Sequence, residues 1–315
     1  MLFEQVLDIL SSVDFYQSMF RLATPLMLAS MGDIVSERSG VLNMSLEGMM
    51  LIGAFFAFVG SSISGNPWIG LLVAVVCALL VGMLHSFCCI SLGINQGVVA
   101  VAINILCSGL CGTMMRTLYG SASAVPRCRG FGPLPVPGLS NIPFIGEALF
   151  AQHWLTYLSL ILIPITWIFF YKTMTGLKIR AVGENPKAVN SIGVNVVIIR
   201  YACVLYSAVL AGLAGVSLSI CGLNTYVDNL VAGRGYVAFA AVIFGKFHPV
   251  GAALGAMLFG FADTLQLNIQ ALGLNIPYQV MLTLPYLMTL AVMFLMSAGT
   301  APKGWAIPYL SERRN

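Results

Sequence analysis

The chain has little charge for its length. Of its 315 residues, 15 are Lys or Arg and 11 are Asp or Glu, together 8%, whereas an ordinary soluble domain has about 25%. Hydrophobic residues make up 59%, and the mean hydropathy is +0.92. No water-soluble fold of this size can bury so much apolar surface, so a soluble enzyme is excluded.

Catalytic and metal-binding motifs are also missing. The eight cysteines form no CxxC pair, which argues against a zinc or redox site. No Walker A, HExxH or GxSxG pattern occurs, and the small net charge of +4 gives no indication of nucleic-acid binding. We therefore expect no enzyme, no cofactor and no metal. Any energy for transport must come from another subunit or from an ion gradient.

The charged residues leave long apolar gaps. None lies between Glu47 and Arg116, or between Asp263 and Lys303. A spanning helix needs about 20 apolar residues, so the first gap has room for three spans and the second for two. The sequence predicts an all-α polytopic membrane protein with residues 1–315 as a single transmembrane domain.

About eight to nine transmembrane segments are expected. Full spans are predicted at 16–34, 47–64, 68–92, 98–118, 154–171, 200–221, 251–270 and 279–297. The apolar piece at 236–247 would cover only about 18 Å as a helix. We predict a broken half-helix there, which presents unpaired backbone groups to a cavity and turns before Pro249.

Lys and Arg predict the sidedness of the chain, because they favour cytoplasmic loops. The segment 172–199 with Arg200 is the densest basic stretch and is assigned to the cytoplasm, together with the C-terminus. Counting back places 119–153 and the acidic N-terminus outside. The outer loop is rich in Pro and Gly but lacks the composition of a disordered linker, so an ordered irregular surface is expected.

A polar segment, 32–48, interrupts two apolar spans. Within it, Asn43, Ser45 and Glu47 are spaced two residues apart just ahead of a predicted helix. One interpretation is a hairpin exposed to the cytoplasm. The other is irregular backbone at membrane depth, which is tolerated only where it is buried in protein or lines a cavity.

A single amide, Asn104, lies within a predicted span. It needs a partner, either another helix or a ligand. We predict that Asn43, Glu47 and Asn104 meet around a central cavity, since a buried polar group without a partner costs about 1–3 kcal/mol. With Ser45 and an aromatic wall at Phe239, they form the candidate substrate pathway.

A short helix is predicted between 184 and 193. Asn185 suits the N-cap, Pro186 the first helical position and Gly193 the left-handed stop. Such a helix is either a solvated connector or a rigid knob that a membrane subunit presents to a partner.

Four stretches together resemble a known family. They are SERSGVLNMSLEGMMLIGA at 36–54, GVVAVAIN at 97–104, RAVGENPKA at 180–188 and GRGYVAFAAVIFGKFHPVG at 233–251. Their order and content are similar to bacterial ABC-importer permeases of the branched-chain amino acid, ribose and nucleoside group, and most similar to the nucleoside-type branch. Ribose-type members carry a glycine- and aspartate-rich stretch where this chain has VLNMSLE, which argues against a simple sugar.

The resemblance implies a multi-pass permease of the cytoplasmic (inner) membrane. Its implied partners are a second homologous permease, cytoplasmic ATPase subunits and an external solute-binding lipoprotein. The implied solute is nucleoside-like or flavin-like, with riboflavin among the candidates, and a simple sugar is the alternative. The implied ATPase coupling residues are Glu184, Asn185, Pro186, Lys187, Ala188, Ser191 and Gly193.

Two rival functions remain open at this stage. An ion-coupled secondary transporter would need carboxylates near the midplane, and only Asp263 and Glu47 are candidates. A scaffold or channel would need no ATP. Both rivals predict that no ATPase subunit accompanies the chain.

Overall fold

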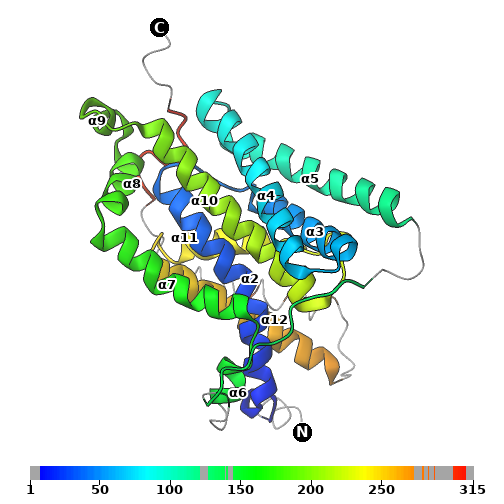
Figure 1. Cartoon of the computed structure of the whole chain (residues 1–315). Coiled ribbons are helices and arrows are strands. Elements are labelled where there is room, and N and C mark those ends of the chain that lie inside the picture. Colours follow the sequence, from blue (N-terminus) through cyan, green and yellow to red (C-terminus); the bar gives the residue numbers. More distant parts are fainter. Residues whose placement is uncertain are drawn as a thin grey trace.

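The computed structural model describes residues 8–120, 127–138, 140, 145–272, 279, 283, 287 and 301–309. Every regular element in this part of the chain is a helix (Figure 1), which confirms the all-α prediction. The longer helices are α2 (Val13–Arg38), α3 (Leu46–Ser64), α4 (Pro67–Ser86), α5 (Gln96–Tyr119), α7 (Trp154–Lys172), α10 (Val196–Val216) and α12 (Pro249–Ala271). The shorter ones are α6 (Ile145–Phe150), α8 (Met174–Glu184), α9 (Pro186–Ser191) and α11 (Arg234–Phe244).

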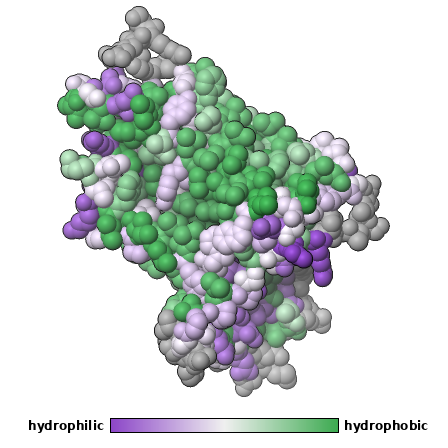
Figure 2. Space-filling model, viewed as in Figure 1, coloured by the Kyte–Doolittle hydropathy of each residue, from purple (hydrophilic) through white to green (hydrophobic). Residues whose placement is uncertain are grey.

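Six helices in the described residues are long and apolar enough to cross a membrane. They are α3, α4 with its π-helical extension η1 (Phe87–Ser91), α5, α7, α10 with its extension η2 (Ser217–Leu223), and α12. Figure 2 agrees: hydrophobic residues form a broad band across the visible face, and hydrophilic residues gather near its two ends. The predicted span at 279–297 lies almost entirely outside the described residues.

Helix α2 has the length of a span but an unusual composition. Its 26 residues extend about 39 Å, yet they include Asp33 and Glu37, and every residue from Ala23 to Glu37 is buried. Helices α7, α10, α11 and α12 surround it. The most polar long helix therefore lies at the centre, and the apolar helices cover it.

Helix α2 is longer than the predicted span 16–34. It continues to Arg38, so only residues 39–45 are irregular, and all of these except Leu42 and Met44 are fully buried. The interpretation of this segment as an exposed cytoplasmic hairpin is therefore wrong. Leu42 N–H donates to Gln96 and Met44 C=O accepts from Asn104. These partners lie eight residues, or about 12 Å, apart along α5, so the segment rises into the bundle before α3 begins.

Glycines let α3 and α10 approach closely. A Cβ on Gly53 would lie 2.7 Å from the Cα of Gly212, and one on Gly215 would lie 2.1 Å from the carbonyl oxygen of Met50. Close approach through small residues is how helices gain packing energy in lipid, where no hydrophobic effect acts between them.

The predicted broken hairpin is present. Helix α11 has 11 residues and ends at Phe244, and α12 begins at Pro249. Between them, Lys246 and Phe247 adopt left-handed backbone conformations with φ of 57° and 55°. The chain is therefore not helical between α11 and α12, because the residues before the proline adopt turn conformations.

The two ends of the bundle carry different segments of the chain. Helix α6 and the N-terminal end of α2 lie at one end, and α8, α9 and the C-terminal segment lie at the other (Figure 1). In the outer loop, Cys128 and Phe131 N–H groups donate to the carbonyls of Asn224 and Ile220 at 2.9 Å. The ring of Phe131 packs edge-on against Trp68 and Trp154. The described part of this loop is therefore an ordered cover.

We expect Gly215→Ala to destabilise the protein by about 1–3 kcal/mol, because the new methyl group meets the α3 backbone, which cannot move aside. Gly109→Ala is the matched control: it lies mid-helix in α5 with nothing within 4 Å of the added Cβ. The readout is the temperature at which half of the detergent-purified protein is lost from its monodisperse gel-filtration peak. Equal midpoints for the two variants would contradict this packing.

Candidate functional site

Glu47 holds the start of the broken helix. Its two carboxylate oxygens each accept a backbone N–H at 2.8 Å, one from Gly233 and one from Gly235, at the N-terminus of α11. A Cβ on Gly235 would lie 2.5 Å from the backbone nitrogen of Glu47, so only glycine permits this approach. A carboxylate is stabilised there by the helix dipole as well as by the two hydrogen bonds.

This arrangement corrects one expectation. The half-helix was predicted to present unpaired backbone groups to a cavity, but Glu47 takes up two of its N-terminal N–H groups. The N-terminus of α11 therefore already has an acidic partner within the protein.

Asn104 joins three segments at the same point. Its Oδ1 accepts the Gly48 N–H at 2.9 Å, and its Nδ2 donates to the Met44 carbonyl at 3.0 Å and to the Tyr236 hydroxyl at 2.8 Å. Because Gly48 follows Glu47 and Tyr236 follows Gly235, the structure brings Glu47 and Asn104 together beside the start of α11.

Asn43 and Ser45 are placed differently. Both are fully buried. Asn43 donates from Nδ2 to Ser207 Oγ at 3.0 Å, and Ser45 Oγ donates to Asn43 Oδ1 at 2.6 Å and contacts His85 Nδ1 at 3.1 Å. These contacts tie the irregular segment 39–45 to α4 and α10. Phe239 is also buried, in the apolar core.

A polar cavity lies one helical turn beyond Asn104 along α5. Its volume is about 330 Å³, and it is lined by Leu51 on α3, Ser108, Gly109, Gly112, Thr113 and Arg116 on α5, and Tyr226, Asp228 and Asn229 on the loop before α11. None of the five predicted pathway residues lines it: Asn43, Ser45 and Phe239 lie elsewhere, and Glu47 and Asn104 lie next to it. The residues that do line it were not recognised in the sequence.

A sequence signal for this cavity does exist. Asn104, Ser108, Gly112 and Arg116 are spaced four residues apart, and residues at this spacing share one face of a helix. They form a polar and small-residue stripe along α5, inside a span otherwise rich in Val, Ile and Leu. We call this the α5 stripe.

The loop from Leu223 to Arg234 forms the other wall. Asn224, Asn229 and Ala232 have φ values of 55°, 57° and 48°, so the chain turns sharply here. Tyr226 is buried against Phe55, with ring centroids 5.1 Å apart. Since Glu47 binds Gly233 at the end of this loop, it also sets the position of the cavity wall.

The site offers hydrogen bonds and not catalysis. Hydroxyl, amide, guanidinium and carboxylate groups line one small cavity, a composition suited to binding a polar solute. Among the residues that the structure describes, no group of three or more His, Cys, Asp or Glu side chains is arranged to hold a metal ion.

The predicted short helix is present at the opposite end as α9, Pro186–Ser191. Asn185 Oδ1 accepts the Ala188 N–H at 3.1 Å, and Gly193 has φ +85°. The helix is shorter than the range 184–193, because Glu184 ends α8 instead. Val189 is buried, whereas Lys187, Ala188, Ser191 and Ile192 are exposed.

Close backbone contacts join this unit to α2. A Cβ on Gly183 would lie 2.1 Å from the carbonyl oxygen of Arg38. The C-terminal segment 301–309 adds two links: Gly304 N–H donates to Gly183 C=O at 2.8 Å, and Trp305 Nε1 donates to Glu37. Helices α8 and α9 are thereby fixed to the end of the central helix.

A bundle of membrane-length helices with a solute-sized polar cavity defines a membrane transport protein. Residues 15–297 match the family described as branched-chain amino acid transport system, permease component, and the chain belongs to this family. It is therefore a multi-pass protein of the cell inner membrane and a transport component of an ABC system, not an enzyme. The family implies association with ATPase and substrate-binding components.

Several curated proteins are similar over almost their whole length. A putative glucose ABC transporter permease of Haloferax volcanii is 37% identical over 91% of this chain and 92% of its own. A guanosine ABC transporter permease of Bacillus subtilis is 37% identical over 93% and 95%. A nucleoside ABC transporter permease of Lactococcus lactis is 33% identical over 92% and 95%.

The α5 stripe can be tested by labelling. We expect Ser108→Cys and Gly112→Cys to react in intact cells with a small water-soluble thiol reagent, because both face the cavity. Leu110→Cys, exposed on the opposite face of α5, should stay unlabelled in lipid. Burial raises the pKa of the Cys128 thiol in the outer loop, which keeps its background reaction low. Uniform labelling along α5 would contradict a water-filled cavity.

Proposed function

We propose that this chain is the permease subunit of an ABC importer for nucleosides, and that the solute moves along the α5 stripe. The observation that carries the proposal is the polar cavity beside Asn104 and the contact of Glu47 with the start of α11. Two relatives named for guanosine and nucleoside transport, each similar over more than nine-tenths of this chain, support the choice of solute.

The lining of the cavity suits a nucleoside. A carboxylate such as Asp228 can accept from two neighbouring sugar hydroxyls, and the amide of Asn229 can pair with the donor and acceptor edge of a heterocycle. Ser108 and Thr113 add adaptable hydroxyls. The volume of about 330 Å³ lies at the small end of the range of about 300–1,000 Å³ for ligand pockets.

A second, homologous permease subunit would complete the pathway. Nothing lies within 4 Å of a Cβ built on Gly109 or Gly112, so α5 leaves open space along its stripe. In our proposal the partner permease closes this space, an external binding lipoprotein delivers the solute, and two cytoplasmic ATPase subunits drive the cycle.

Helix α9 is the proposed coupling element. Ala188 and Ser191 lie three residues apart on one side, and Ile192, 76% exposed, lies beside them. A small-residue face with one apolar anchor suits insertion into a groove on the ATPase. Force on α9 would then reach α2 through Gly183 and Arg38.

A sugar is the second candidate solute. The similarity to a putative glucose permease favours it, and a sugar would use Asp228 and Asn229 without needing a heterocycle contact. Riboflavin has no comparable support among these relatives, although its hydroxylated chain would suit the same groups.

Uptake by cells that express the chain with its partner subunits should separate these solutes. We expect radiolabelled guanosine to accumulate, and glucose and riboflavin to remain at background. Asn104→Leu should lower guanosine uptake about tenfold or more, the worth of one or two buried hydrogen bonds. Asn268→Leu on α12, away from the cavity, is the matched control. Normal uptake by Asn104→Leu would overturn the proposed path, and glucose uptake without guanosine uptake would overturn the solute.

The coupling role of α9 predicts that Ala188→Arg abolishes ATP-driven uptake, because a long side chain wedges the docked surfaces apart. The same substitution at Ala271, exposed at the outer end of α12, should leave uptake unchanged. Binding of solute by the external protein should be equal in both. A cysteine at 188 should also cross-link to the ATPase. Normal uptake by Ala188→Arg, with no cross-link from any position between 186 and 192, would make α9 only a connector.

A further inference from the structure

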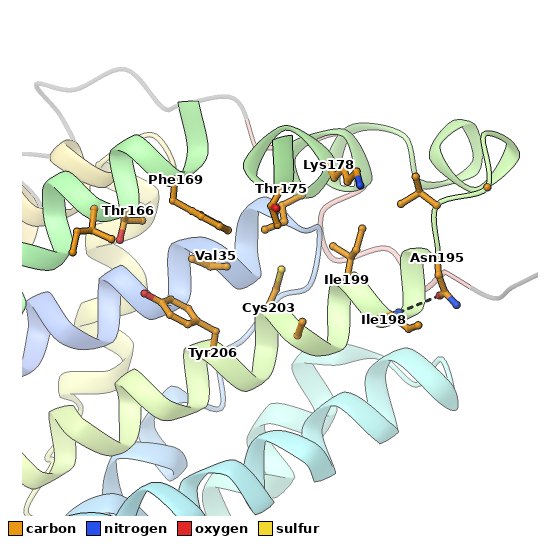
Figure 3. Close-up of a pocket in the computed structure, with 15 residues that line it drawn as sticks. Val35, Thr166, Phe169, Thr175, Lys178, Asn195, Ile198, Ile199, Cys203 and Tyr206 are labelled. Carbon is orange, nitrogen blue, oxygen red and sulfur yellow. Dashed lines mark hydrogen bonds between the residues drawn. The ribbon is translucent and has the colours of Figure 1, made fainter. Parts of the chain in front are cut away.

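A second cavity lies far from the α5 stripe, in a groove between α7, α8 and α10 (Figure 3). Its volume is about 750 Å³, and it shares no lining residue with the polar cavity. Its walls are mainly apolar, with Ile165 and Phe169 on α7, Ile179 on α8, and Ile199 and Cys203 on α10. We call it the α7–α10 groove.

The length of the groove matches one leaflet of a bilayer. On α10 it extends from Asn195 to Tyr206, eleven residues or about 17 Å apart along the helix. The hydrocarbon core of a membrane is about 30 Å thick, so one leaflet contributes about 15 Å. The groove begins at the end of the bundle that carries the basic segment, which places it in the cytoplasmic leaflet.

The charge at the mouth is positive. Lys178, Thr175 and Asn195 are the polar residues at this end, and Thr166 and Tyr206 lie toward the far end (Figure 3). The lining contains no Asp or Glu. Basic pockets between helices at the cytoplasmic surface attract anionic lipid head groups, because that leaflet carries negative charge.

We propose that the α7–α10 groove binds an anionic phospholipid of the cytoplasmic leaflet. The acyl chains lie along Phe169, Ile199 and Cys203, and the phosphate of the head group pairs with Lys178. Because Lys178 belongs to α8, which leads directly into α9, the lipid stabilises the position of α8 and α9 against α7 and α10.

The test uses the full-length protein in nanodiscs of phosphatidylcholine with and without phosphatidylglycerol. Native mass spectrometry counts the phosphatidylglycerol that stays bound after extraction. Lys178→Glu removes the head-group contact, and Ala202→Trp, at an exposed position in the lining, fills the groove. Lys172→Glu and Ile161→Trp are matched controls, exposed on α7 outside the groove.

We expect both groove variants to retain at most about one-fifth of the phosphatidylglycerol that the wild type retains, which is the effect of about one basic residue near an anionic surface. Both controls should match the wild type. Phosphatidylglycerol should also raise the thermal midpoint of the wild type and of the controls only. Equal retention of the two lipids, or equal loss in the controls, would overturn the proposal. So would a photo-cross-linker at position 202 that captures a second permease chain in place of lipid.

Discussion

The carboxylate of Glu47 bound to the start of α11 is the contact on which the site depends. A helix that begins inside a membrane leaves backbone N–H groups without water, and each must find a partner within the protein. Glu47 supplies two acceptors at once, to Gly233 and Gly235. This contact joins α11 to α3. It also fixes the position of the last part of the loop that carries Asp228 and Asn229. Asn104 then bonds on both sides of this contact, to Gly48 and Tyr236. The cavity wall, the broken helix and the α5 stripe are therefore positioned by one side chain and its neighbours.

The central position of α2 explains why so little charge is needed elsewhere. Asp33, Glu37 and several serines are concentrated on this one buried helix, and the helices around it are free to face lipid with apolar side chains. Glu37 is held by the Asn43 N–H at 2.8 Å and by Trp305, so the polar centre is linked both to the segment 39–45 and to the C-terminal segment. The surrounding helices approach it through small residues, as at Gly32 beside Leu210 and Gly260 beside Ala23.

Composition and local chemistry predict the helices well, because a span needs a fixed length and a cap needs particular residues. The long stretches without charged residues predicted the positions of α3, α4 and α5. The capping residues Asn185, Pro186 and Gly193 predicted α9. Residues 32–38 were harder to predict as a helix, because their polarity is typical of a loop and only tertiary contacts make them helical. Asn43 was expected beside Asn104, but its side chain faces Ser207 on α10. The spacing along one segment does not determine which neighbour each side chain meets. The α5 stripe was readable from its four-residue spacing, whereas Asp228 and Asn229 reach it only because the loop folds back.

The same contacts form a mechanical path from one end of the bundle to the cavity. Helix α9 continues from α8, whose Gly183 lies against the backbone of Arg38, and Trp305 bonds to Glu37, one residue earlier on α2. Glu37 in turn accepts the N–H of Asn43, and Ser45 follows within the same fully buried network. Two residues later, Glu47 holds α11. Packed interiors resist compression and transmit displacement, so a movement of α9 cannot be absorbed within this path without breaking buried hydrogen bonds. Short-range contacts alone therefore connect α9 to the residues beside the polar cavity.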